Sequence, residues 1–180
     1  GRVHNGIEKP RLLVFSADNG VVREGVSSAP QSVTLRQTVN LTKGKTGAAV
    51  LCRQFGCGIS VCDVGVNADI EEPAVINRKI AYGTDNIAEG PAMTREQALR
   101  AIRIGTELAM ETKADALGVG EMGIGNTTTS SAVLAVLLDR DIELVTGRGG
   151  GLTDDAFTKK KAVIRQAIRV NRPNQNDVID

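Results

Sequence analysis

The sequence predicts a single α/β domain over residues 1–180, in which helices flank a mostly parallel sheet in a three-layer, Rossmann-like arrangement. Two observations predict this fold class. Short apolar runs bounded by turn residues alternate with longer segments of helical periodicity. The chain is also long enough to bury about 70% of its unfolded surface without disulfides or metals. We therefore expect parallel strands joined by right-handed crossovers.

The first part of the chain forms one strand–helix–strand unit. RLLVFSA over 11–17 is a continuous apolar run, which is typical of a strand buried on both faces. A loop rich in Gly, Ser and Pro follows over 25–30, and two helices are expected over 32–43 and 47–54. GISVCDVGV over 58–66 predicts the second strand.

A long polar connection over 67–91 leads into a helix with a clear start signal. Thr94 and Gln97 have the spacing of a capping box, in which each side chain accepts a hydrogen bond from the backbone of the other residue. Apolar positions then line one helical face as far as about Glu111. ADALGV over 114–119 predicts the third buried strand.

The rest of the chain contains two further helices. Asn126 or Thr127 could cap a helix over 128–138, which is almost wholly small or apolar and is therefore expected to be buried. IELVTGRGGG over 142–151 fits either a short strand or a loop. A last helix runs to about Val170. Parallel sheets bind ligands beyond the carboxyl ends of their strands, where these loops meet.

Composition excludes several classes of function. Lys and Arg number 22 against 21 Asp and Glu, so the net charge of +1 provides no chain-wide field for nucleic acid or an anionic membrane. Aromatic residues are only 2%, which argues against base-stacking surfaces. No apolar stretch is long enough to span a membrane, and no secretory signal is visible, so the expected compartment is the cytoplasm.

The residues that usually hold metals or form nucleophilic sites are few. His4 is the single histidine, which argues against a His-rich metal site and a Ser-His-Asp triad. Cys52, Cys57 and Cys62 lack the C-x-x-C spacing of zinc and redox motifs, and they are expected to be reduced, mostly buried, small hydrophobic residues. We therefore expect no metal and no cofactor.

One glycine pattern suggests a dinucleotide site. Gly118, Gly120 and Gly123 form G-x-G-x-x-G after a strand and before a helix. Glu121 lies inside the pattern, where its carboxylate would repel a pyrophosphate, and no acidic residue ends the next strand. A nicotinamide-dinucleotide enzyme is therefore kept only as an alternative.

The same loop fits a phosphate monoester better. Gly123, Gly125, Asn126 and Thr127 would present backbone N–H groups at a helix N-terminus, and Glu121 could accept hydrogen bonds from two ribose hydroxyls. The competing interpretation is purely structural, with a capped helix and glycines that permit tight packing.

A second glycine loop could hold the same phosphate. Residues 147–151 (GRGGG) precede a helix that carries Lys159, Lys160 and Lys161. At most one of these lysines should point inward, because three consecutive helical residues face different directions. The competing interpretation is a flexible connection followed by a solvated basic face.

Five segments in this order resemble one enzyme family, the CobT-type nicotinate-nucleotide:dimethylbenzimidazole phosphoribosyltransferases. They are FSADNGVVREGVSSAPQSVT (15–34), DVGV (63–66), GTDNIAEGPAMTREQA (83–98), GEMGIGNTT (120–128) and GRGGGLTDD (147–155). The resemblance implies transfer of phosphoribosyl from nicotinate mononucleotide to dimethylbenzimidazole, giving alpha-ribazole phosphate and nicotinate in cobalamin lower-ligand assembly. It also implies small-molecule substrates and a homodimer.

The resemblance also assigns roles to particular residues. Glu121 would hold the ribose. The slot for the benzimidazole, or for a related base, would be lined by Ser28, Gln31 and Met122. The residues implied in phosphate binding are Gly123, Asn126, Gly149, Gly151 and Lys160.

The resemblance leaves part of the family pattern unmatched. The family's general base is a glutamate that we expect beyond Asp180, so no catalytic residue is assigned in this sequence. The family's small helical domain is also largely absent, and Asn19 stands where the family usually has histidine. These departures predict a fragment of a longer phosphoribosyltransferase. A non-catalytic nucleotide-binding module is the other alternative.

Overall fold

The computed structural model describes residues 6–180, so His4 lies outside the described residues. The elements follow in the order β1 (Pro10–Ala17), the 3-10 helix η1 (Gly20–Glu24), α1 (Val33–Thr42), α2 (Gly47–Gln54), β2 (Gly58–Gly65), β3 (Val75–Asn77), α3 (Arg95–Glu111), β4 (Ala116–Met122), α4 (Asn126–Leu137), α5 (Ile142–Val145) and α6 (Asp154–Asn171). Strands and helices alternate along the chain, as is typical of an α/β fold.

Four parallel strands form one sheet in the order β3-β2-β1-β4. The central strand β1 pairs with β2 on one side and with β4 on the other, so that Leu13 lies between Ser60 and Val119. All pairings are parallel, which confirms the expected fold class. Parallel pairing also brings the loops after β1, β2 and β4 to one edge of the sheet.

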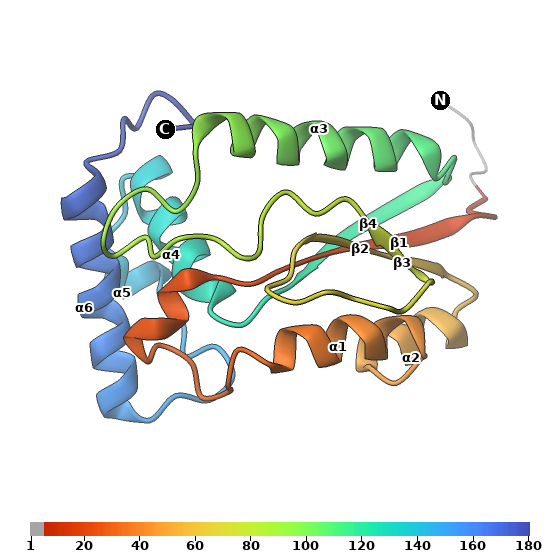
Figure 1. Cartoon of the computed structure of the whole chain (residues 1–180), viewed down its shortest axis with the longest axis horizontal. Coiled ribbons are helices and arrows are strands. Elements are labelled where there is room, and N and C mark those ends of the chain that lie inside the picture. The colour runs from red at the N-terminus through yellow and green to blue at the C-terminus, as the bar shows by residue number, and fades with distance from the viewer. Residues whose placement is uncertain (1–5) are drawn as a thin grey trace.

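Helices cover both faces of the sheet (Figure 1). On one face, Leu13 of β1 packs against Ile104 and Leu108 of α3. On the other face, Val14 packs against Leu41 of α1, and α2 lies on the same side. Adjacent residues of β1 therefore belong to opposite layers of the core, because successive side chains of a strand point to opposite faces.

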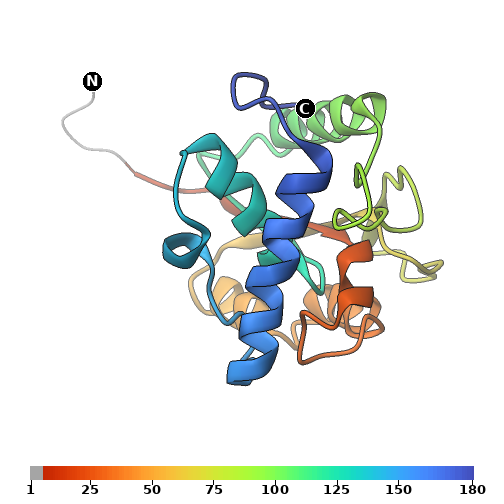
Figure 2. The same cartoon turned by 90° about the vertical axis from the view of Figure 1, so that its left-hand side faces the viewer.

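Helix α6 stands across the carboxyl edge of the sheet (Figures 1 and 2). Ile164 of α6 packs against Ala132 of α4 and Ile142 of α5, while Val163 packs against Val21 of η1. These two clusters hold the end of the chain against the loops where parallel sheets usually bind ligands. No helix within residues 6–180 combines the length and apolar character needed to cross a lipid bilayer.

Two strand predictions need correction. The connection predicted over 67–91 contains the short strand β3, in which buried Val75 pairs with Val61 of β2. Three residues among polar neighbours show no periodicity, so the sequence pattern does not reveal this strand. The third predicted strand, 114–119, instead spans Ala116–Met122, because its pairing with β1 continues as far as Met122. The prediction that it is buried is wrong: β4 is an edge strand, and Val119 is 73% exposed.

Two helix predictions also need correction. The segment predicted as a strand or a loop contains α5, whose first turn is capped by the Asp141 side chain accepting from the Glu143 N–H (3.0 Å). Helix α4 begins earlier than expected, after Gly125 at the N-cap position, and neither Asn126 nor Thr127 caps it. It is also not wholly buried, since Val133 is 52% exposed.

The capping box of α3 is confirmed and can be tested. Thr94 Oγ1 accepts from the Gln97 N–H (3.2 Å) and Gln97 Oε1 accepts from the Thr94 N–H (2.8 Å). We expect Thr94→Ala to lower the free energy of unfolding by about 1 kcal/mol, measured by urea denaturation. Thr106→Ala, at an exposed position inside the same helix, is the control and should change it by less than about 0.5 kcal/mol. Equal effects of the two substitutions would contradict a capping role.

Candidate functional site

Two glycine-containing loops meet at the side chain of Lys160. This side chain on α6 is 0% exposed, and its Nζ donates to Thr127 Oγ1 (2.7 Å) and to the carbonyl oxygen of Gly147 (2.9 Å). Thr127 lies in the first turn of α4, and Gly147 begins the second glycine loop. The expectation that one lysine points inward is confirmed, because Lys159 is exposed and Lys161 pairs with Glu143.

The ammonium group of Lys160 is buried without a matching negative charge. Among residues 6–180, none of the ion pairs includes Lys160. Burial lowers its pKa from the ordinary lysine value. A buried charge is costly unless it is paired with an opposite charge, so an anion bound here would offset that cost. The arrangement therefore favours a negatively charged ligand.

The N-terminus of α4 brings the positive end of a helix dipole to the same place. Gly125 occupies the N-cap position with a φ of 88°, a conformation that glycine adopts readily. The Thr127 N–H is bonded to Asn126 Oδ1 (2.8 Å), so the Asn126 side chain lies over the first turn. The Asn126 N–H donates to the Gly123 carbonyl oxygen (3.1 Å) and the Thr128 N–H donates to the Gly125 carbonyl oxygen (2.9 Å). The feature of this terminus that favours a phosphate is therefore the positive end of the helix dipole.

The first glycine loop is fixed against β1 and α1. A side chain at Gly123 would bring a Cβ within 2.2 Å of the Ala17 carbonyl oxygen, so no other residue fits without a shift of the backbone. The Asn19 side-chain amide donates to the Ile124 carbonyl (3.2 Å), and the Ile124 N–H donates to Thr34 Oγ1 (3.1 Å). This close contact alone explains why position 123 is a glycine, so a phosphate contact of Gly123 stays a prediction.

Sequence reasoning missed Asn19, Thr34 and the Thr127 hydroxyl as residues that organise the site. Asn19 lies two residues after the end of β1, at the edge where the loops converge, and this position was the one available signal. Thr34 and Thr127 each lie in the first turn of a helix, where threonine is usual for reasons of local structure. Their contacts across the fold are therefore invisible in the sequence.

The second glycine loop approaches the first one closely. A Cβ added at Gly149 would lie 3.0 Å from Thr127 Oγ1 and 3.7 Å from Lys160 Nζ. Ser28 Oγ donates to the Gly150 carbonyl oxygen (3.2 Å), which links the loop to the N-terminal third of the chain. Gly151 is exposed, and within 6–180 no atom lies within 4 Å of a Cβ placed there. The structure thus brings Ser28, Gly149 and Lys160 together.

Glu121 and Met122 point to opposite faces of β4. Met122 packs onto the core cluster that contains Val14 and Leu41. Glu121 is on the other face and is exposed, although partial burial of its carboxyl group raises its pKa. Gln31 is half-buried just before α1, where its carbonyl accepts from the Thr34 N–H (2.9 Å). The ribose and base contacts of these side chains stay predictions.

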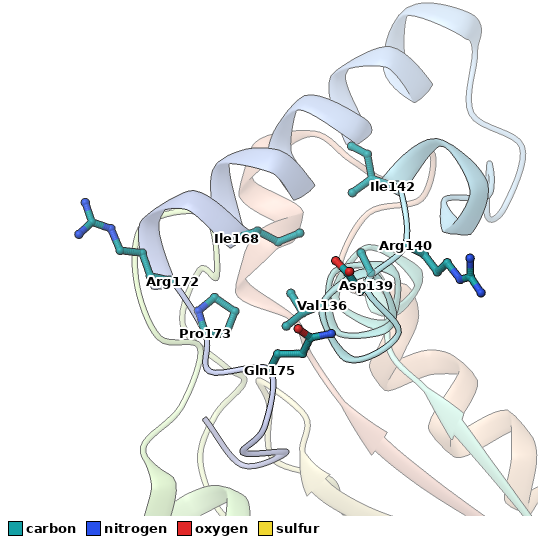
Figure 3. Close-up of a pocket in the computed structure, with 9 residues that line it drawn as sticks. Val136, Asp139, Arg140, Ile142, Ile168, Arg172, Pro173 and Gln175 are labelled. Atoms are coloured by element: carbon teal, nitrogen blue, oxygen red, sulfur yellow. The ribbon is translucent and has the colours of Figure 1, made fainter.

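A separate hollow lies at the far end of α4 and α6 (Figure 3). Its volume is about 440 Å³, and it is lined by Val136 and Ile168 among others. The side chains of Arg140 and Arg172 point away from it (Figure 3). Ile168 lies two turns beyond Lys160 on α6, about 12 Å along the helix axis, so this hollow is distinct from the loops at Lys160.

The packing of the first glycine loop provides a test. We expect Gly123→Ala to lower the free energy of unfolding by about 1 to 3 kcal/mol, because its Cβ would overlap the Ala17 carbonyl oxygen. Gly147→Ala is the matched control, since in the described part of the chain no atom lies within 4 Å of a Cβ there. It should change stability by less than about 0.5 kcal/mol. Thermal and urea unfolding measure both variants, and a tolerated Gly123→Ala would contradict the packing argument.

Comparisons with known proteins identify the family of the chain. A family model described as phosphoribosyltransferase matches residues 1–180. The chain is similar to the nicotinate-nucleotide–dimethylbenzimidazole phosphoribosyltransferase of Ruminiclostridium cellulolyticum, with 49% identity over 100% of this chain and 52% of the relative. It is also similar to the enzyme of that name from Clostridium perfringens (strain 13 / Type A), with 48% identity over 100% of this chain and 51% of the relative. The crystal structure of CobT from Thermus thermophilus superimposes with a TM-score of 0.90 at 36% identity, over 98% of this chain and 54% of that one.

The chain spans about half the length of the curated relatives that it matches. The family model, in contrast, covers the whole chain. The fold, the loop order and these matches lead to one conclusion: the chain belongs to the phosphoribosyltransferase family of the nicotinate-nucleotide–dimethylbenzimidazole type.

Proposed function

We propose that the chain carries the nucleotide-binding part of an enzyme that transfers phosphoribosyl from nicotinate mononucleotide to dimethylbenzimidazole, giving alpha-ribazole phosphate and nicotinate. The observation that carries this proposal is the buried ammonium of Lys160, which joins two glycine loops and has no ion-pair partner within residues 6–180. The printed names of the relatives support the substrates. Such a product would serve in cobalamin lower-ligand assembly.

The proposed mechanism begins with the phosphate of the mononucleotide. Lys160 would bind its oxygens together with Gly123 in the first loop, the Asn126 side chain at the start of α4, and the amides of Gly149 and Gly151 in the second loop. An ammonium and several amides hold a phosphate in one position, which fixes the attached ribose for reaction.

The ribose would develop positive charge as the bond to nicotinate breaks, because its transition state is oxocarbenium-like. Glu121 would accept hydrogen bonds from the ribose hydroxyls and stabilise that charge as a carboxylate. Ser28, Gln31 and Met122 would line the slot for the flat acceptor base. The proton that leaves dimethylbenzimidazole requires a general base, which we expect outside this sequence.

The remaining family properties belong to the same proposal. The resemblance implies the homodimer, and the cytoplasmic location stays an expectation from the sequence. A dinucleotide enzyme is less well supported, because Gly118 and Gly120 pair with Leu12 and Val14 inside β4 and only Gly123 lies in the loop. A non-catalytic binding module differs from the enzyme in the release of nicotinate when both substrates are present, measured on a protein that also contains the expected general base.

The phosphate contact of Lys160 can be tested by titration calorimetry with nicotinate mononucleotide. We expect Lys160→Met, which keeps most of the side-chain volume, to weaken binding about tenfold to a hundredfold, because a charged hydrogen bond is lost. Lys159→Met is the matched control on the exposed neighbour and should leave the affinity unchanged. Glu121→Ala should also weaken binding, through the ribose. If Lys160→Met and Glu121→Ala both leave the affinity unaltered, the two glycine loops have only a structural role.

The affinity should also depend on pH through Lys160. The protonated ammonium binds phosphate, and burial lowers its pKa in the free chain. The nucleotide affinity is therefore expected to fall as the pH rises through an alkaline range that begins below the ordinary lysine pKa. Lys160→Arg should remove this alkaline loss, because arginine stays protonated. Calorimetry across that pH range measures the nucleotide affinity of the unmodified chain and of Lys160→Arg. If the two affinities depend on pH in the same way, Lys160 is not the group that titrates at the phosphate.

A further inference from the structure

The C-terminal end of α2 brings two cysteines together. The Cys57 N–H donates to the Cys52 carbonyl oxygen (2.8 Å), and the Gly56 N–H donates to the Arg53 carbonyl (3.4 Å). Gly56 has a φ of 65°, so the helix ends in a Schellman motif. In this motif the side chains of the third-last helical residue and of the second residue after the cap are frequently in contact. Those two positions are Cys52 and Cys57.

The backbone hydrogen bond also sets the distance between the two residues. Adding the Cα–C, C=O and N–Cα bond lengths to the 2.8 Å hydrogen bond limits the separation of the two Cα atoms to about 7 Å, and bent angles shorten it further. Disulfides require Cα atoms closer than about 7 Å. Both cysteines are free thiols in this structure. The cap therefore holds a reduced pair within reach of a covalent bond.

The two thiols differ in their surroundings. Cys57 is half-exposed, whereas Cys52 is buried. Burial raises the pKa of Cys52, and the neighbouring thiol of Cys57 raises it further. A reagent in solution therefore reaches Cys57 first, and Cys52 lies behind it as the second thiol.

We propose that Cys52 and Cys57 form a redox-active dithiol that a small-molecule disulfide such as oxidised glutathione converts into an intramolecular disulfide. The Cys57 thiolate attacks one sulfur of the oxidant, forming a mixed disulfide and releasing one glutathione thiolate. The Cys52 thiolate then attacks Cys57 Sγ, which forms the Cys52–Cys57 bond and releases the second glutathione. The protein loses two hydrogens and two electrons, and the oxidant gains them as two thiols.

Cys62 provides an internal control for this reaction. Its side chain is fully buried in β2, and burial together with the Asp63 charge raises its pKa to about 12. It is therefore expected to stay reduced under conditions that oxidise the pair. The pair itself lies at the end of α2, away from α6 and the glycine loops (Figure 1).

The test uses the whole 180-residue chain, incubated at low concentration with oxidised glutathione, alkylated under native conditions and digested with trypsin. Arg53 lies between the two cysteines, so the disulfide joins the peptides of residues 46–53 and 54–78. Mass spectrometry should find this linked pair. Thiol titration of the unfolded protein should show loss of two of the three thiols.

Two variants make the assignment specific. Cys62→Ala should keep the linked peptides, and Cys57→Ser should abolish them while leaving Cys52 reduced. Because Cys57 is half-exposed, the serine variant should fold, which circular dichroism confirms. A glutathione adduct that persists on Cys57, a bond that includes Cys62, or a link only between two chains would each overturn the proposal. Retention of all three thiols would also overturn it.

Discussion

The site depends on the hydrogen bonds of one buried ammonium group. Lys160 connects the first turn of α4 to the loop after α5, through the Thr127 hydroxyl and the Gly147 carbonyl. Both partners are neutral, so the positive charge remains uncompensated inside the fold. The side chain that joins the two loops therefore also carries a buried positive charge, which a bound anion would neutralise. A single side chain thus both joins the two loops and places a positive charge between them.

This coupling depends on the way α6 lies over the carboxyl edge of the sheet. Ile164, one turn after Lys160, packs against α4 and α5, and Val163 packs against η1. These apolar contacts fix the helix in two directions, so that Lys160 points toward the loops. Packing in the core thus determines where the charge is placed.

The sequence allowed prediction of the strands and helices that have strong local signals. The apolar runs of β1 and β2 and the capping box at Thr94 depend on neighbouring residues alone, and the structure confirms them. The three-residue strand β3 is formed by its pairing with β2, which no local pattern encodes. At the site, the inward position of one lysine was predictable from helix geometry. The contacts of Asn19 and Thr34 with the first loop were not, because they join residues far apart in the sequence.

The tight contact between Gly123 and the end of β1 has a thermodynamic consequence for the loop. With the Ala17 carbonyl so close, and with Asn19 and Thr34 bonded on either side, the loop has little conformational freedom before any ligand arrives. The entropy of ordering the loop is lost when the chain folds, so it would not be lost again on binding of the proposed nucleotide. A preorganised cradle of this kind lets more of the contact energy contribute to affinity.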